Sequence, residues 1–183
     1  MDLITLDFET YYDKDFSLKK LTIEEYLRTS RFEVIGVSVK VNSGTTEWAS
    51  GTHEQLSNYL RQYSWEDSML LCHNTMFDGA ILAWNFDIHP HVYADTLCIA
   101  RAIHGVETSV SLRAVSEKYE VGVKGTEVVN ALGKRRSEFT AEELSRYGDY
   151  CINDVDLTYK LFMLMAKGFP RFELKLIDLT LRM

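Results

Sequence analysis

The pattern of hydrophobic and polar residues predicts strands separated by helices. Residues 1–10 begin with an apolar run and end in polar side chains, as expected of a buried strand with one open end. Residues 35–41 alternate between apolar and small or polar side chains, which favours a strand with one buried face. Residues 69–72 form a short continuous apolar run, typical of a central strand. Two further strands are predicted at residues 45–48 and 92–95.

Helix starts are indicated by local capping patterns. Thr22 with Glu25, and Thr140 with Glu143, have the spacing of a capping box. Helices are predicted at residues 23–28, from 52 onward, at 77–84, 96–102, 112–119 and 141–166, and from 172 onward. Residues 120–139 contain several glycines and predict a loop. Early strands followed by strands that alternate with helices predict an α/β fold, with a mixed five-stranded sheet flanked by helices.

Composition is that of an ordinary globular domain. The 183 residues are enough for one substantial core, and no apolar run approaches the length of a membrane span. The chain opens directly on a strand, without the pattern of a signal peptide. Cys72, Cys98 and Cys151 are odd in number, lie in apolar surroundings and show no CxxC spacing. We therefore expect reduced cysteines, an intracellular location and no membrane association.

The net charge of −7 argues, at face value, against a nucleic-acid partner. The argument is weak if several acids bind divalent cations, because such ions reverse the local field. Basic residues also cluster in and beside the predicted loop, at Lys118, Lys124, Lys134, Arg135 and Arg136. Taken alone, this cluster is most simply interpreted as a solvated loop.

Two carboxylates stand together at the end of the first strand. Asp7 and Glu9 are two residues apart, so their side chains project from the same face. Adjacent carboxylates at the end of a buried strand repel each other, and a hard divalent cation such as Mg²⁺ or Mn²⁺ relieves that repulsion. An isolated Asp-x-Glu is more often a strand end whose acids reach water, so the metal interpretation needs further carboxylates.

Further acids occur where such a site would need them. Asp78 lies at the start of the helix after the fourth strand, where an acid is also favoured simply by the helix dipole. Asp154 lies on the inward face of the long helix, between Cys151 and Val155, where a carboxylate is costly unless paired or liganded. Tyr150 is four residues earlier and therefore shares its face. Together these residues favour a metal site.

Three stretches of the chain resemble the three motifs of the DnaQ-like 3′–5′ exonucleases. These are Asp7-Phe8-Glu9, residues 74–78 and residues 150–154, and the resemblance extends to about residue 166. It implies a ribonuclease-H-like fold. A tyrosine four residues before the last aspartate resembles the tyrosine (DEDDy) subclass, which is typical of the proofreading domains of DNA polymerases.

The resemblance also implies a mechanism. Two Mg²⁺ or Mn²⁺ ions would be held by Asp7, Glu9, Asp78 and Asp154, while Tyr150 would orient the attacking water. Nucleoside 5′-monophosphates would be released from the 3′ end of single-stranded or mismatched DNA. Candidate substrate-binding residues are Phe8, Thr10, Asn74 and Phe77, with Tyr11 and Tyr12 as further possible walls. Each of these aromatic residues could equally belong to the core.

The last fifteen residues resemble the junction that follows the exonuclease domain in bacteriophage-type family A DNA polymerases. This resemblance implies an exonuclease domain at residues 1–168, and at 169–183 the start of a junction to a polymerase domain of the same parent chain. It also implies a location in the host cytoplasm. Helical spacing places two apolar stripes on this segment, which are too many for a free surface helix.

Other functions are compatible with parts of this pattern. A standalone 3′–5′ exoribonuclease would use the same chemistry, and nothing in the motifs reads the sugar. A catalytically silent interaction module would keep the fold, but the four carboxylates and Tyr150 disfavour it. A ribonuclease-H-type endonuclease is disfavoured by the Tyr-x-x-x-Asp helix.

Overall fold

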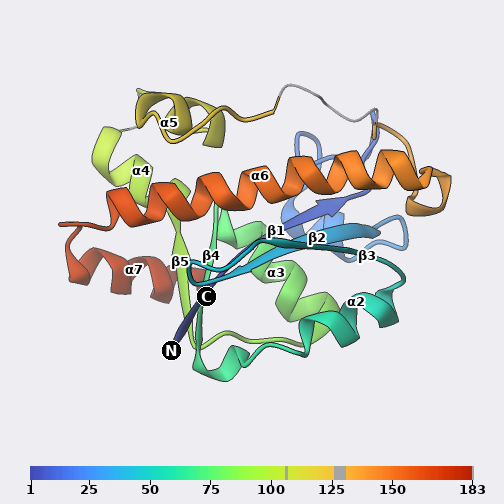
Figure 1. Ribbon diagram of the computed structural model, residues 1–183, viewed down its shortest axis with the longest axis horizontal. Helices are drawn as coiled ribbons and strands as arrows, with labels where there is room; N and C mark the ends of the chain where they lie inside the picture. The colour runs from blue at the N-terminus through green and yellow to red at the C-terminus, as the bar shows by residue number, and fades with distance from the viewer. Residues whose placement is uncertain (106, 126–130, 183) are drawn as a thin grey trace.

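A computed structural model describes residues 1–105, 107–125 and 131–182 (Figure 1). Its centre is one sheet in the strand order β3-β2-β1-β4-β5. The strands are β1 (Asp2–Thr10), β2 (Val34–Val41), β3 (Glu47–Ser50), β4 (Ser68–Cys72) and β5 (Val92–Asp95). The central strand β1 pairs antiparallel with β2 and parallel with β4, so the sheet is mixed. The predicted α/β fold with a mixed five-stranded sheet is confirmed.

Helices cover both faces of the sheet. They are α1 (Ile23–Leu27), α2 (His53–Leu60), α3 (Thr75–Phe86), α4 (Thr96–His104), α5 (Leu112–Lys118), α6 (Ala141–Met165) and α7 (Arg171–Arg182). The long helix α6 crosses β1, β2 and β3 on one face, whereas α2 and α3 lie on the other (Figure 1). Helices α4 and α5 pack against α6, and α7 packs against β5.

The helix starts are fixed by local sequence. The predicted capping boxes of Thr22 with Glu25 and of Thr140 with Glu143 are both present. In each, the threonine hydroxyl accepts from the backbone N–H three residues on, and the glutamate accepts from the threonine N–H. These bonds satisfy donors that the first helical turn would otherwise leave unpaired.

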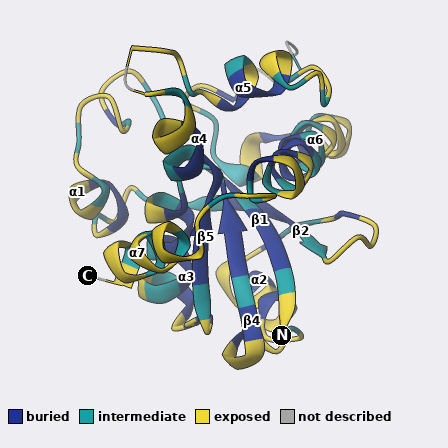
Figure 2. Ribbon diagram, turned by 90° about the vertical axis from the view of Figure 1, so that its left-hand side faces the viewer, coloured by how far each residue is buried: buried dark blue, intermediate teal, exposed yellow. Residues whose placement is uncertain are grey.

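Strands β1, β2, β4 and β5 are largely buried, as their dark blue segments in Figure 2 show, whereas β3 is partly exposed. Ile4, Leu6 and Phe8 alternate along β1 and join the core beneath α1, α2 and α3. A second core forms where α4, α5 and α6 meet, and it includes Leu157 and Leu161 of α6. Because side chains alternate along β1, Asp7 and Glu9 project to the opposite face, toward α6.

The third strand and the loop at 120–139 can be compared with their predicted bounds. The third strand begins at Glu47, two residues later than predicted, where its pairing with Val39 of β2 begins. The hydroxyl of Thr46, just before the strand, donates to Asp156 of α6 at 2.5 Å. The described parts of the predicted loop at 120–139 are irregular apart from a single 3₁₀ turn, Arg136–Glu138. Residues 126–130 of that loop lie outside the described residues.

The C-terminal helix α7 presents two different sides. The side that packs on the two cores carries Leu174, Ile177 and Leu181. The exposed side carries Phe172, Leu176 and Leu179. Asp178 also accepts a hydrogen bond from the backbone N–H of Tyr93 on the edge strand β5, at 2.8 Å. The inner side of α7 thus contributes to this fold, and the junction at 169–183 stays a prediction.

A matched pair of substitutions tests this division of α7. Ile177→Ala should lower the free energy of unfolding by about 1–2 kcal/mol, because Ile177 is partly buried and loses apolar contacts. Leu179→Ala, on the exposed side, should change it by less than about 0.5 kcal/mol. Urea unfolding measures both. Equal losses in the two variants would contradict the packing of α7.

Candidate active site

Strand β1 delivers the first two carboxylates to the face covered by α6. Asp7 and Glu9 are half-buried, and the pairing of β1 with β2 shifts register between Glu9 and Thr10. A bulge of this kind locally increases the twist of a strand and re-aims the side chains beside it. The predicted pair therefore stands at the open end of the central strand.

Helix α3 supplies the third carboxylate. Asp78 is buried, with 3% of its surface exposed, and its Oδ1 accepts from the backbone N–H of Phe8 at 3.1 Å. The start of α3 is held by Asp95, whose carboxylate accepts from the N–H groups of Asn74 at 3.0 Å and Thr75 at 3.2 Å. These bonds fix Asp78 against the strand that carries Asp7.

Helix α6 supplies the fourth. Asp154 is 4% exposed, and its Oδ2 forms an ion pair with Lys124 at 2.7 Å. Its Oδ1 is buried and has no hydrogen-bond partner among the described residues. Tyr150 lies one turn earlier on the same helix, with its ring 5.2 Å from the Lys124 ammonium. An orphaned buried carboxylate oxygen is costly, which marks Asp154 as a group that needs a further partner.

The four carboxylates act on one another electrostatically. Burial and the charge of Asp154 raise the pKa of Asp7 to about 7. Burial and the charge of Asp7 raise the pKa values of Glu9 and Asp78 well above their usual range. Burial also raises the pKa of Asp154, although Lys124 opposes that effect. Predicted from separate parts of the sequence, these acids therefore form one cluster centred on Asp7.

The donor set fits a hard divalent cation. Ligand atoms of Asp7, Glu9 and Cys151 all lie within 4.8 Å of one another, and the free oxygen of Asp154 adds another donor to the cluster. Carboxylate oxygens suit Mg²⁺ and Mn²⁺. Cys151 suits such a cation less well, because its sulfur is a softer donor than the carboxylate oxygens. Its Sγ instead donates to Asp7, to Oδ2 at 3.5 Å and to the backbone oxygen at 3.3 Å.

Three residues beside the carboxylates were not predicted to belong to the site. Cys151 was interpreted only as a reduced cysteine in apolar surroundings, and Tyr147 was not singled out. In the structure, Cys151 contacts Asp7 and the Tyr147 hydroxyl lies beside Glu9. Their spacing of four residues, on the helix that carries Asp154, could have indicated them. Lys124 carried no local signal, because it reaches Asp154 from a loop thirty positions earlier.

The predicted basic cluster does not form one surface. Lys134 pairs with Glu143 at 2.6 Å, and Arg135 pairs with Glu33 at 3.2 Å, so both brace the fold away from the carboxylates. Among these three, Lys124 is the one that contacts a predicted metal-binding carboxylate. The interpretation as a simple solvated loop is therefore wrong for Lys124.

The predicted substrate-binding residues separate into two groups. Phe8 is 5% exposed and stacks on Phe86 in the core, with ring centroids 5.8 Å apart. It points away from Asp7 and Glu9, so its prediction as a substrate wall is wrong. Thr10 and Phe77 instead line a cavity of about 480 Å³. Asn74 is half-buried at the start of α3 in a left-handed conformation (φ 87°), and its side chain does not cap the helix.

A family model described as 3′–5′ exonuclease matches residues 14–169. The chain therefore belongs to this family of 3′–5′ exonucleases. The match begins after Asp7 and Glu9, so the assignment of these two residues rests on the geometry above. A comparison with curated protein sequences gives no match.

Solved structures share the fold at low sequence identity. RNase D of Trypanosoma brucei aligns with a TM-score of 0.73 and 14% identity, over 98% of this chain and 64% of that chain. Brucella melitensis NrnC with bound Mg²⁺ aligns with a TM-score of 0.65 and 15% identity, over 98% of this chain and 80% of that chain. The family B DNA polymerase of Pyrobaculum calidifontis aligns with a TM-score of 0.64 and 13% identity, over 90% of this chain and 24% of that chain.

Exonucleases of this family generally depend on divalent metal ions, in agreement with the donor set of the carboxylate cluster. Within the described ranges, no helix is both long enough and apolar enough to cross a membrane. The location in a host cytoplasm stays a prediction.

Lys124 should compete with cations for the carboxylates. Lys124→Met should bind Mn²⁺ roughly three- to tenfold more tightly, because removing the ammonium leaves the site more negative. Lys134→Met is the matched control, since its partner Glu143 lies outside the site. Isothermal titration calorimetry measures both affinities. Unchanged or weaker binding by Lys124→Met would show that the ion pair does not oppose metal binding.

Proposed function

We propose that this chain is a metal-dependent 3′–5′ exodeoxyribonuclease that removes nucleoside 5′-monophosphates from single-stranded or mismatched DNA ends. The observation that carries the proposal is the convergence of Asp7, Glu9, Asp78 and Asp154 at the open end of β1, with Tyr150 beside them. Clustered carboxylates with raised pKa values and an unpaired buried oxygen are costly to a fold and are typical of functional sites.

Each residue has a distinct task in this proposal. Asp7, Glu9, Asp78 and Asp154 would hold two Mg²⁺ or Mn²⁺ ions. When bound, these ions would lower the pKa of the attacking water and neutralise charge on the phosphate. Burial raises the pKa of Tyr150 above its ordinary value, so its phenol stays protonated near neutral pH. Tyr150 therefore acts as a hydrogen-bond donor that orients the water, and not as a base.

Polymerase proofreading is the context that we favour. The exposed stripe of Phe172, Leu176 and Leu179 on α7 would pack against a polymerase domain that continues from residues 169–183. Two observations support this partner: the apolar character of that stripe, and the likeness of the fold to part of a family B DNA polymerase. A mismatched 3′ end costs less to unpair, so a proofreading site would select it without reading its sequence.

An exoribonuclease is the second candidate. It is favoured by the likeness to NrnC and to the RNase D structures, whose names denote ribonucleases. The carboxylate cluster serves either substrate, because the reacting phosphodiester is the same in DNA and RNA.

Matched strands decide between the two candidates. A single-stranded DNA and an RNA of the same sequence, each labelled at its 5′ end, are incubated with the protein and Mg²⁺. We expect stepwise shortening from the 3′ end, with DNA degraded at least about tenfold faster, a difference of about 1.4 kcal/mol in transition-state binding. Faster degradation of RNA would replace our proposal by the second candidate.

A further inference from the structure

The cavity that Thr10 and Phe77 line is formed mainly by the loop that joins β1 to α1. Thr10 follows Glu9 and Phe77 precedes Asp78 in the chain. The lining residue Tyr12 lies near the carboxylate cluster, since burial and the charge of Glu9 raise the pKa of its hydroxyl. Its remaining lining residues are Tyr12, Asp13, Lys14, Ser17, Leu18, Lys19, Lys20, Tyr26 and Leu132. Most of them come from residues 11–21, which we call the β1–α1 loop.

The walls of this cavity suit a nucleobase. Tyr12 and Phe77 offer half-buried aromatic rings, and Leu18 and Leu132 are 43% and 48% exposed despite being apolar. Exposed apolar and aromatic surface beside a site for phosphate chemistry favours the stacking of bases, which is tolerant of sequence.

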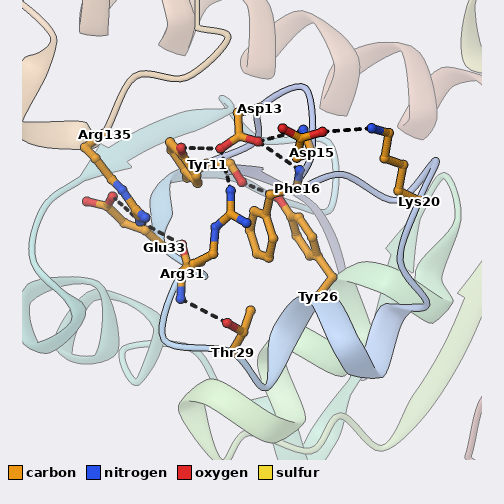
Figure 3. Close-up of polar contacts among 10 residues, drawn as sticks. All are labelled: Tyr11, Asp13, Asp15, Phe16, Lys20, Tyr26, Thr29, Arg31, Glu33 and Arg135. Atoms are coloured by element: carbon orange, nitrogen blue, oxygen red, sulfur yellow. Dashed lines mark hydrogen bonds and ion pairs between the residues drawn. The ribbon is translucent and has the colours of Figure 1, made fainter.

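The β1–α1 loop is built as a rigid element (Figure 3). Oδ1 of Asp13 accepts from the backbone N–H groups of Asp15 and Phe16, at 2.9 and 2.8 Å. Its Oδ2 accepts from the Tyr11 hydroxyl at 2.6 Å and pairs with Arg31 at 2.7 Å. These bonds hold the pKa of Asp13 well below its usual range, so the carboxylate stays charged and keeps the loop ordered.

Aromatic packing anchors the same loop to α1. Phe16 stacks on Tyr26 with ring centroids 4.5 Å apart, and the Tyr26 hydroxyl donates to the backbone oxygen of Tyr11. Arg31 lies over the Phe16 ring, 4.6 Å from its centroid. A loop held in this way meets a ligand with little further loss of conformational freedom.

The rim of the cavity is positive although the chain as a whole is acidic. Lys14, Lys19 and Lys20 are exposed and lie within seven residues. Lys20 forms a solvent-exposed pair with Asp15 at 3.0 Å, whereas the described residues provide no ion pair for Lys14 or Lys19. The other acid of the loop, Asp13, is already neutralised by Arg31. The ammonium groups of Lys14 and Lys19 can therefore contact an anionic ligand. The nearby carboxylates would otherwise repel such a ligand.

We propose that the β1–α1 loop is a clamp for single-stranded polynucleotide. Lys14, Lys19 and Lys20 contact phosphates upstream of the bond that is cut, and the cavity between Phe77 and Leu18 receives a base. The clamp holds a strand that the carboxylates alone would repel, and it makes the site prefer a 3′ tail of several nucleotides over a single terminal one. This inference rests on the proposed nuclease function.

Two lysine triples test the clamp. The loop triple is Lys14→Gln, Lys19→Gln and Lys20→Gln. The control triple is Lys160→Gln, Lys167→Gln and Lys175→Gln, which removes the same charge from exposed lysines on or near α6 and α7. Binding of a fluorescent oligothymidylate is measured by anisotropy over a range of salt concentrations with Ca²⁺ in place of Mg²⁺, so that the readout does not depend on hydrolysis. Circular dichroism confirms that both triples remain folded.

We expect the loop triple to bind the oligothymidylate roughly tenfold more weakly at low salt. The slope of log affinity against log salt should become less negative by about two, because three phosphate contacts are lost. The control triple should match the parent. Equal effects in both triples, or no effect in either, would overturn the clamp.

Hydrolysis of the p-nitrophenyl ester of thymidine 5′-monophosphate separates the clamp from the catalytic proposal. This ester has no upstream phosphate, so the loop triple should hydrolyse it at the parent rate. A parent protein that binds the oligothymidylate through the loop but fails to cleave the ester would contradict the proposed function and leave the clamp standing. A loop triple that loses ester hydrolysis and strand binding together would overturn the clamp, because the lysines would then support the catalytic centre itself.

Discussion

Asp7→Ala should lower the rate of nucleotide release by more than about a thousandfold, and Asp7→Ala with Glu9→Ala should abolish it. Asp7 is the centre of the cluster, since its charge raises the pKa values of both Glu9 and Asp78. Alanine at position 7 removes one of the proposed metal ligands and several kcal/mol of transition-state stabilisation. A loss of about 4 kcal/mol corresponds to a thousandfold lower rate. The measurement is release of mononucleotides from single-stranded DNA in Mg²⁺.

Asp2→Ala is the matched control for Asp7→Ala. Asp2 is an exposed aspartate of the same strand, and its carboxylate only accepts from the Asn42 amide at 2.8 Å. Both variants should keep the circular dichroism of the parent, because burial and the charge of Asp154 penalise the Asp7 carboxylate, and alanine removes that penalty. Nuclease activity of Asp7→Ala near that of Asp2→Ala would show that β1 does not carry the reaction.

The metal-free protein should lose stability as the pH rises from about 4 to about 7. The folded state raises the pKa of Asp7 from 3.8 to about 7, so within this window the folded chain holds a proton that the unfolded chain has released. Stability falls with pH wherever the folded state binds more protons. Below this window the carboxyl is protonated in both states, and above it the full cost of burying the charge is present.

Thermal unfolding in EDTA at pH 5 and pH 8 measures this effect. Asp7→Asn should have a higher midpoint than the parent at pH 8, by roughly 3 to 6 °C if solvent screening reduces the difference to about 1.4 kcal/mol. Mn²⁺ should raise the midpoint of the parent more than that of Asp7→Asn. A parent that becomes more stable from pH 5 to pH 8 in EDTA would contradict the assignment of repulsion to this cluster.

The fold was largely predictable because its determinants are local. Thr22 and Thr140 start helices through bonds that reach only three residues along the chain, and the apolar alternation of β1 and β2 fixes their buried faces. The third strand was placed two residues too early because its bounds depend on its pairing with β2, which the local run of polar residues does not report.

The four carboxylates of the site could be predicted from the sequence, but the residues that contact them could not. The four carboxylates occupy strand ends and helix faces, which the periodicity of the sequence defines. The contact of Lys124 with Asp154, and of Cys151 with Asp7, depends on how a loop and a helix cross the sheet, which the sequence does not state. Phe8 was misassigned because its motif neighbours are functional, whereas strand alternation turns its own side chain into the core.

The central claim is that one cluster of carboxylates makes this chain a 3′–5′ exonuclease. The most direct measurement follows a 5′-labelled primer with a mismatched 3′ end, annealed to its template, in Mg²⁺ with the parent protein and with Asp7→Ala. The account predicts stepwise shortening from the 3′ end and nucleoside 5′-monophosphates as the product, with neither in Asp7→Ala. Internal cleavage by the parent, or equal shortening by both proteins, would contradict it.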